Sequence, residues 1–247
     1  MESRIRLAKR IAESGIASRR EAEKLIESGH VMVDGQIVKT PAFFVTDTVH
    51  VLIDGKDLPL KSKEIVIWKF HKPREVITTK NDPRNRKTVF DFLKDINQRL
   101  IYVGRLDYNS EGLLLFTNNG QVARKMELPA TGLKRVYRVR VRGNLTSEKI
   151  QRLKTGLVIE GVKYRGIDIK VNGTCKGRAN FWITAILREG KNREIRKLME
   201  HVGCIVSRLI RISYGSFNLG NLPPGNIQQA TPQEIKELLK ILEFSFN

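Results

Sequence analysis

The stretch Val103-Gly104-Arg105-Leu106-Asp107, followed by Glu111-Gly112-Leu113-Leu114-Leu115-Phe116-Thr117, decides how the rest of the chain is interpreted. The run from Leu113 to Phe116 is entirely apolar, which is typical of a buried strand. Asp107 stands just ahead of this strand, where a loop can present a side chain on a rigid support. Most aspartates in loops are turn formers, so these residues alone make Asp107 no more than a candidate for catalysis.

The pattern around this stretch predicts an α+β fold with a mixed, largely antiparallel sheet. Tyr137, Val139 and Val141 alternate with arginines, as in a strand with one buried face. The arginines, Arg138, Arg140 and Arg142, are most simply a solvated face, with RNA contact as the alternative, and Tyr137 alone is best explained as a core residue. Further strands are expected at 65–70, 113–116, 179–187 and 205–212, and helices at 88–94, 193–201 and 231–244. The predicted helices do not alternate regularly with the predicted strands, as they would in repeated βαβ units.

The first sixty residues predict a separate small domain made of two helices and a hairpin. Ser18 and Glu21 form a capping box that starts the second helix, and Gly29 ends it. Val31 and Val33 alternate into a strand that is followed by an Asp34-Gly35 turn. A polar linker is expected over residues 56–63, so the predicted domains are 1–60 and 61–247.

The charge predicts a polyanionic partner. The chain has 45 Lys and Arg against 26 Asp and Glu, a formal net charge of +19 and a pI near 10.2. Such an excess attracts nucleic acid, although a basic proteome or an anionic lipid surface would also account for it.

Cys175 and Cys204 are far apart in the sequence and have no neighbouring Cys or His at the spacing of metal ligands. We therefore expect two core thiols in a reducing compartment and no metal site. No apolar stretch is long enough for a membrane span or a leader, which predicts a cytoplasmic protein.

Three motifs in the first domain are shared with a known RNA-binding module. The segments Leu7-Ala8-Lys9-Arg10, 17–23 and Val31-Met32-Val33-Asp34-Gly35 resemble a small domain of a small-subunit ribosomal protein, of tyrosyl-tRNA synthetases and of several RNA-modifying enzymes. A solvated, charged helix pair is the alternative. The resemblance implies an arm that binds phosphates through its basic residues, namely Arg4, Lys9, Arg10, Arg19, Arg20 and Lys24.

Four ordered motifs in the remainder resemble pseudouridine synthases, and more narrowly the ribosomal small-subunit pseudouridine synthase A type, which includes enzymes acting on large-subunit rRNA. The first is the stretch quoted above. The others are Lys72-Pro73-Arg74 with Thr78-Thr79, then Lys134-Arg135-Val136-Tyr137, and finally 188–196 continued by 206–211. The end of the chain, including Leu222-Pro223-Pro224-Gly225, is most similar to the members that modify large-subunit rRNA.

The resemblance implies roles for particular residues in the isomerisation of a uridine in ribosomal RNA. Asp107 would be the catalytic carboxylate, acting on the ribose, on the base or as a base in elimination. Tyr137 would stack on the uracil and handle a proton, and Lys191 would pair with Asp107. RNA contacts are expected from Arg105, Arg193 and Arg196, with the uridine flipped out of its stack. The reaction needs no cofactor or metal, and a monomer is expected.

Two departures from the family pattern affect what the resemblance implies about how the RNA strand is bound. Glu75 stands where the family usually has Gly after Lys-Pro-X, which would be costly if that backbone needs a positive φ. Leu128-Pro129 replaces a common His-Pro. Two other functions stay open: a non-catalytic ribosome-assembly factor that retains the fold, and a tRNA-acting synthase of the same family.

Overall fold

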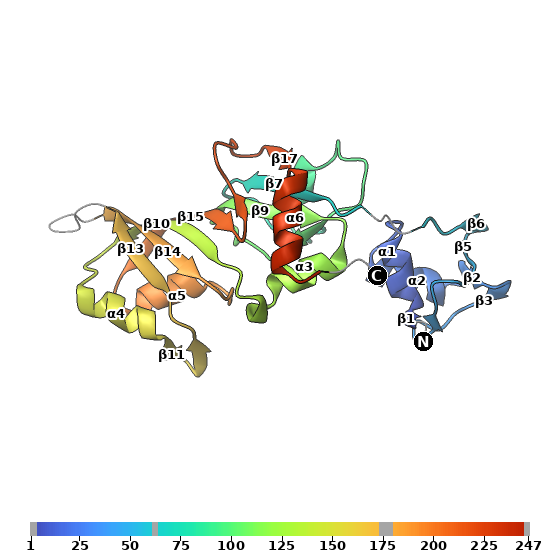
Figure 1. Ribbon diagram of the computed structural model, residues 1–247, viewed down its shortest axis with the longest axis horizontal. Coiled ribbons are helices and arrows are strands. Elements are labelled where there is room, and N and C mark those ends of the chain that lie inside the picture. The colour runs from blue at the N-terminus through green and yellow to red at the C-terminus, as the bar shows by residue number, and fades with distance from the viewer. Residues whose placement is uncertain (1–3, 61–63, 173–179, 245–247) are drawn as a thin grey trace. The chain divides into compact units, whose positions relative to one another are not determined.

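The computed structural model describes residues 4–60, 64–172 and 180–244, which form two compact units. One unit contains residues 1–65 with two short later segments, and the other contains the rest of the chain (Figure 1). Residues 61–63 lie outside the described part, so the predicted domain boundary between residues 60 and 61 stays a prediction. Cys175 also lies outside it, whereas Cys204 is buried as expected.

The first unit contains helices α1 (Leu7–Glu13) and α2 (Arg19–Glu27) and a small sheet in the order β3-β2-β5-β6. These strands are β2 (Val31–Val33), β3 (Gln36–Ile37), β5 (Val51–Ile53) and β6 (Lys56–Asp57), and β1 (Ile5–Arg6) pairs separately with β4 (Phe44–Val45). The predicted capping box of Ser18 and Glu21 is present. The linker begins later than expected, because Lys56 and Asp57 extend the hairpin from β5.

The second unit contains a sheet of nine strands whose main path is β13-β14-β10-β15-β9-β7-β17. Only the pairing of β15 with β9 is parallel among the described strands, so the predicted mixed, largely antiparallel α+β sheet is confirmed. The strands on this path are β7 (Ile67–Lys72), β9 (Glu111–Thr117), β10 (Arg135–Arg142), β13 (Asp168–Asn172), β14 (Asn180–Leu187), β15 (Ile205–Tyr214) and β17 (Ile227–Gln229). Short strands β8 (Ile101–Val103) and β16 (Phe217–Asn218) pair with β9 and β15.

The helices of this unit pack on the sheet through apolar faces. Helices α4 (Ser147–Thr155) and α5 (Glu194–His201) lie on the same side of β10, β13 and β14, and α6 (Pro232–Ile241) lies near α3 (Gly120–Glu127) (Figure 1). A second hairpin joins β11 (Leu157–Ile159) to β12 (Val162–Tyr164), and Pro129–Thr131 form a 3-10 turn, η2. The helix expected over 88–94 is instead a 3-10 turn, η1 (Val89–Phe92).

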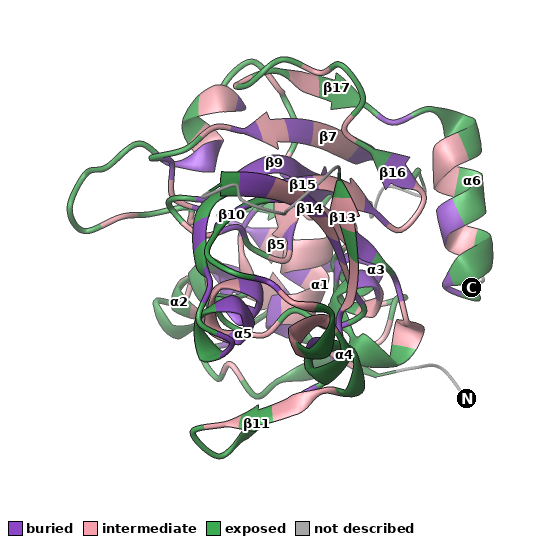
Figure 2. Cartoon of the chain, turned by 90° about the vertical axis from the view of Figure 1, so that its left-hand side faces the viewer, coloured by how far each residue is buried: buried purple, intermediate pink, exposed green. Residues whose placement is uncertain are grey.

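The alternation expected along β10 is confirmed (Figure 2). Val139 and Val141 are buried in the core beneath α4 and α5, whereas Arg138, Arg140 and Arg142 are exposed on the other face of the sheet. Within the described residues, no helix is long and apolar enough to cross a membrane.

Candidate active site

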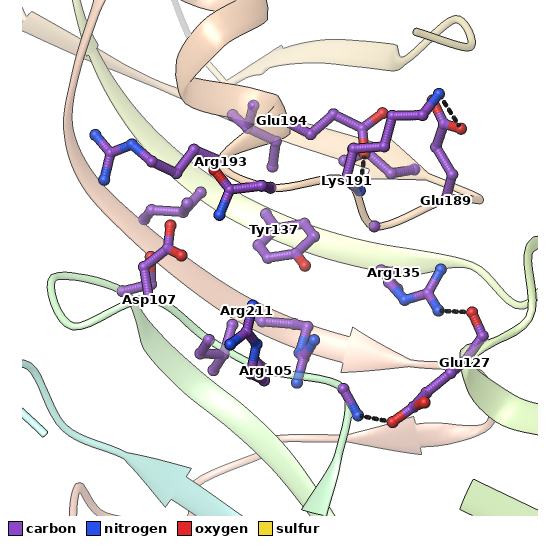
Figure 3. Close-up of a pocket in the computed structure, with 18 of the residues that line it drawn as sticks. Arg105, Asp107, Glu127, Arg135, Tyr137, Glu189, Lys191, Arg193, Glu194 and Arg211 are labelled. Atoms are coloured by element: carbon purple, nitrogen blue, oxygen red, sulfur yellow. Dashed lines mark hydrogen bonds and ion pairs between the residues drawn. The ribbon is translucent and has the colours of Figure 1, made fainter. Parts of the chain in front are cut away.

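A pocket of about 450 Å³ opens beside the stretch that follows β8 (Figure 3). Its wall comes from five segments that are distant in sequence: the loop that carries Asp107, the end of α3 at Glu127, strand β10, the turn before α5, and strand β15. The expected catalytic residues Asp107, Tyr137 and Lys191 all line it, as do Arg105 and Arg193. The fold therefore brings together five of the residues that the sequence predicted, although not in every expected pairing.

The loop of Asp107 is fixed through its backbone. Leu106 is buried, and its carbonyl accepts a hydrogen bond of 2.8 Å from the hydroxyl of Thr78. Gly104, which needs a positive φ of 64°, donates its N–H to Glu127 at 2.7 Å. The N–H of Ser110 closes a turn on the carbonyl of Asp107 at 3.0 Å. These bonds hold the half-buried carboxyl group of Asp107 at the pocket wall.

Lys72 is a buried lysine behind this loop, and it was not predicted as a site residue. Its ammonium group donates to the carbonyl oxygens of Pro73 and Ser110, each at 2.9 Å. Burial lowers the pKa of Lys72 to about 8, although the negative charges of Asp107 and Glu111 act in the opposite direction. Lys72 thus joins the segment after β7 to the segment after Asp107 and places a positive charge near the carboxylate.

Glu75 adopts the left-handed backbone conformation that is costly for a residue other than glycine. Its φ is 63°, in the left-handed region, and its N–H donates to the carbonyl of Tyr108 at 2.8 Å. A side chain in this conformation costs roughly 1–2 kcal/mol compared with glycine. The loop therefore keeps the backbone shape that a glycine would favour and ties itself to the Asp107 loop despite the strain.

Lys191 does not form the expected ion pair with Asp107. Its ammonium group lies 2.9 Å from Glu189 and also bonds the carbonyl of Lys163 (Figure 3). The described cations that act electrostatically on Asp107 are Lys72 and Arg196. The expectation failed because the loop of Lys191 turns toward β12, a direction that the motif does not encode.

Arg196 has a structural role, and its expected RNA contact stays a prediction. It is half-buried, and it donates to the carbonyls of Val206 at 2.9 Å and Asn109 at 3.3 Å. Burial lowers its pKa, as does the neighbouring charge of Arg193, while Asp107 raises it. Arg196 therefore connects α5 to the loop of Asp107.

Two glutamates on the pocket wall interact closely with each other. Glu194 is buried, and burial raises its pKa to about 8, with a further contribution from hydrogen bonding to Glu189. Burial also acts on Glu189, but hydrogen bonds from the backbone of Arg165 and from Lys191 and Glu194 lower its pKa overall. The N–H of Lys191 donates to Glu194 at 2.9 Å. Glu194 therefore holds the turn before α5 in place through this hydrogen bond.

Tyr137 and Arg211 face each other across two strands. They are direct partners in the antiparallel register of β10 and β15, and both line the pocket. Strand β15 in turn meets β9 so closely that a Cβ atom on Gly112 would lie 2.2 Å from the carbonyl oxygen of Arg211. Only glycine at residue 112, with a φ of 103°, allows this approach. Arg135 and Arg211 were not predicted as site residues, although Arg135 precedes Tyr137 by two positions and so shares its face.

The basic residues predicted for the first unit divide into two groups. Lys9 pairs with Glu13 at 3.7 Å, and Arg10 pairs with Asp47 at 3.0 Å. The others are exposed: Arg4, Arg19, Arg20 and Lys24. Within the described residues, no group of three or more His, Cys, Asp or Glu could hold a metal ion.

Comparisons with known proteins agree with these two units. Residues 66–201 match the RNA pseudouridylate synthase family, and residues 5–51 match the S4 domain. An RNA pseudouridine synthase of Rickettsia bellii is 47% identical over 231 residues, which is 94% of this chain and 99% of that protein. Ribosomal large subunit pseudouridine synthase B of Bacillus subtilis is 36% identical over 242 residues, 98% of each.

A solved structure of a pseudouridylate synthase has the same fold, with a TM-score of 0.67 over 95% of this chain and 99% of that one, at 22% identity. The two matched regions include the expected Asp107 and Tyr137 and the arginine pair of α2. The chain belongs to the RNA pseudouridylate synthase family, is a pseudouridine synthase, and carries an S4 domain ahead of the catalytic fold.

Proposed function

We propose that this enzyme isomerises a uridine of large-subunit ribosomal RNA to pseudouridine, with Asp107 as the catalytic nucleophile. The observation that carries the proposal is the placement of Asp107 on the pocket wall, near Lys72 and Arg196 and across from Tyr137. Relatives named ribosomal large subunit pseudouridine synthase B, such as the one from Bacillus subtilis, support the class of RNA.

The site supplies what the reaction requires. The bond between N1 of uracil and C1′ of ribose breaks, the base turns, and C5 bonds to C1′ while the base stays bound. A carboxylate at the pocket wall can attack the ribose or the base ring, or can remove a proton from the ribose. Tyr137 offers a ring on which an extruded base can stack and a phenol that can exchange a proton.

We infer that binding energy comes mainly from basic residues outside the reacting centre. Arg19, Arg20 and Lys24 lie exposed on and near α2, and Arg4 is also exposed, which suits contacts with phosphates. Lys9 and Arg10 are already paired within the first unit, so they are weaker candidates. At the pocket, Arg105 and Arg193 are exposed and can contact the backbone beside the flipped nucleotide.

The test is Asp107→Asn, with Asp95→Asn as the matched control on an exposed aspartate. Asn keeps the volume and one acceptor, so the unfolding temperature and RNA affinity should stay near wild type. The single-turnover rate on a large-subunit rRNA fragment should fall by about a thousandfold or more. A variant that retains more than about a hundredth of the wild-type rate would disprove the assignment. Conversion by wild type of a tRNA but of no rRNA fragment would refute the substrate class, and conversion of no RNA would favour a non-catalytic assembly factor.

A further inference from the structure

Two arginines of the pocket wall are almost completely buried. Arg135 on β10 is 5% exposed and Arg211 on β15 is 2% exposed, and both line the pocket. Within the described residues, neither forms a salt bridge with a carboxylate. An unpaired charge in a buried site is unfavourable, so such a pair needs another source of negative charge.

The two side chains are held in place by hydrogen bonds that leave part of each guanidinium group unused. Arg135 donates through Nη2 to the hydroxyl of Tyr214 at 2.8 Å, and Arg211 donates through Nε to the carbonyl of Leu113 at 2.7 Å. Nη1 of Arg135 and Nη2 of Arg211 are buried and have no hydrogen-bond partner among the residues that the structure describes. Two cationic groups beside the pocket therefore retain capacity to stabilise negative charge.

Tyr214 fixes the pair further. The guanidinium of Arg135 lies 4.6 Å from its ring centroid, and that of Arg211 lies 5.0 Å from it. The ring itself is fully buried, and its hydroxyl donates to the carbonyl of Met126 at 2.8 Å. Cations prearranged in this way stabilise a developing charge without having to reorient during the reaction.

We propose that Arg135 and Arg211 form an oxyanion-binding site for the carbonyl oxygens of the target uracil. This inference rests on the proposed function and adds to it the residues that stabilise the base as it reacts. Arg211 contributes most, because it lies opposite Tyr137, the expected stacking platform, in the strand register (Figure 3). Arg135 lies two positions from Tyr137 on the same face and adds to the field.

The chemistry requires such a site whichever route Asp107 takes. If Asp107 attacks or deprotonates the ribose, the electron pair of the N1–C1′ bond stays with the base, and its negative charge spreads onto the carbonyl oxygens O2 and O4. If Asp107 instead adds to C6 of the ring, the electron pair of the C5–C6 bond shifts toward C4, and the charge appears on O4. In each case negative charge develops on uracil oxygens and leaves them when C5 uses the electron pair to bond C1′. C5 then loses its proton and N1 gains one, which leaves a neutral base and a free Asp107.

The test compares Arg211→Gln with Arg211→Lys, and uses Arg140→Gln on the exposed face of β10 as control. Removal of one oxyanion donor lowers rates by about 100-fold or more, so we expect that loss in the single-turnover rate of Arg211→Gln, with affinity for the rRNA fragment within about threefold of wild type. Arg211→Lys keeps the charge and should recover about tenfold of the rate. Arg140→Gln should retain the wild-type rate.

A merely structural role would lower the unfolding temperature of both Arg211 variants and would not let Lys restore the rate. If Arg211→Gln is unfolded at the assay temperature, Arg211→Lys decides: a wild-type rate overturns the proposal, and a partial loss with unchanged RNA affinity supports it. An RNA with a neutral methylphosphonate beside the target distinguishes a phosphate as the ligand. The proposal fails if the wild-type enzyme binds the modified RNA more weakly than the natural RNA while Arg211→Gln binds both RNAs equally well. That result would show that Arg211 binds a phosphate. Wild type without any turnover would refute the proposed function instead.

Discussion

The two faces of strand β10 carry the same residue type in opposite environments. On one face, Arg135 is 5% exposed and lies in the pocket wall beside Tyr137. On the other face, Arg138, Arg140 and Arg142 point into solvent. Water and salt screen the exposed charges, whereas the buried charge acts at several times that strength on anything that enters the pocket. Burial, and not residue type, therefore distinguishes the arginine of the pocket wall from the arginines of the solvated face.

Among substitutions on β10, the largest effect is expected at Tyr137, on the pocket face. Tyr137→Ala removes the stacking ring and the phenol, so the single-turnover rate should fall by about 100-fold or more. The neighbouring Arg138→Ala should stay within about twofold of wild type, because its side chain points to the other face. Tyr137→Phe separates the two roles of the ring. A wild-type rate in Tyr137→Phe would exclude proton transfer by the phenol and leave stacking.

A buried cation behind the pocket should matter next. Lys72→Met leaves the carbonyls of Pro73 and Ser110 without their donor, which should lower the free energy of unfolding by about 2 kcal/mol. Lys170→Met, which changes an exposed lysine, is the control. Equal stability of the two variants would show that the bonds of Lys72 are unimportant.

The lowered pKa of Lys72 also predicts that the stability of the protein depends on pH. Because its pKa is about 8 when folded and 10.5 ordinarily, the unfolded chain binds more protons between these values. This contribution to stability therefore rises as the pH increases from about 8 to 10.5 and should be absent in Lys72→Met. Chemical unfolding of both proteins across this range measures it.

Glu194 should produce an effect of opposite sign. Its pKa is about 8 in the folded protein and 4.5 ordinarily, so the folded chain binds more protons between these values. Stability should fall as the pH rises through this range. Glu194→Gln mimics the protonated form and should flatten the decline. A variant that loses stability with pH as steeply as wild type would show that another group titrates.

The smallest effect is expected on the exposed face. Replacement of Arg138, Arg140 and Arg142 by Gln should change the free energy of unfolding by no more than about 0.5 kcal/mol, since no buried group loses a partner. If these residues are only solvated, the slope of log affinity for RNA against log salt will not change. A slope lower by about 2 would instead reveal phosphate contacts, at about 0.7 for each.

Local sequence patterns predicted much of the fold because their physical causes are local. The alternation along β10 and the capping boxes of Ser18 and Thr231 depend on residues within a few positions of one another. The short segment after Thr88 has a capping box too, but it is not long enough for an α-helix and forms a 3-10 turn. The placement of Asp107 ahead of a buried strand was also visible in the sequence.

The remaining features depend on contacts between distant segments. Lys191 was expected near Asp107 from its motif, yet its partner Glu189 is only two positions away and was not considered. The burial of Lys72 depends on the loop that ends at Ser110, and that of Arg211 on β9. Such contacts leave no periodic pattern in the sequence, because they form only when distant strands pair in the sheet.

The parallel pairing of β15 with β9 has a consequence for how the enzyme is made. It joins Glu111 and Gly112 to Ile210 and Arg211, residues about a hundred positions apart in the chain. Contacts of such long range form late and slowly, after the entropy of closing a large loop has been overcome. A ribosome therefore has to release β15 from its exit tunnel before Gly112 can pair with Arg211. Until then the nascent chain is a basic polypeptide with its S4 domain complete and no working pocket, and it can bind RNA before it can modify any.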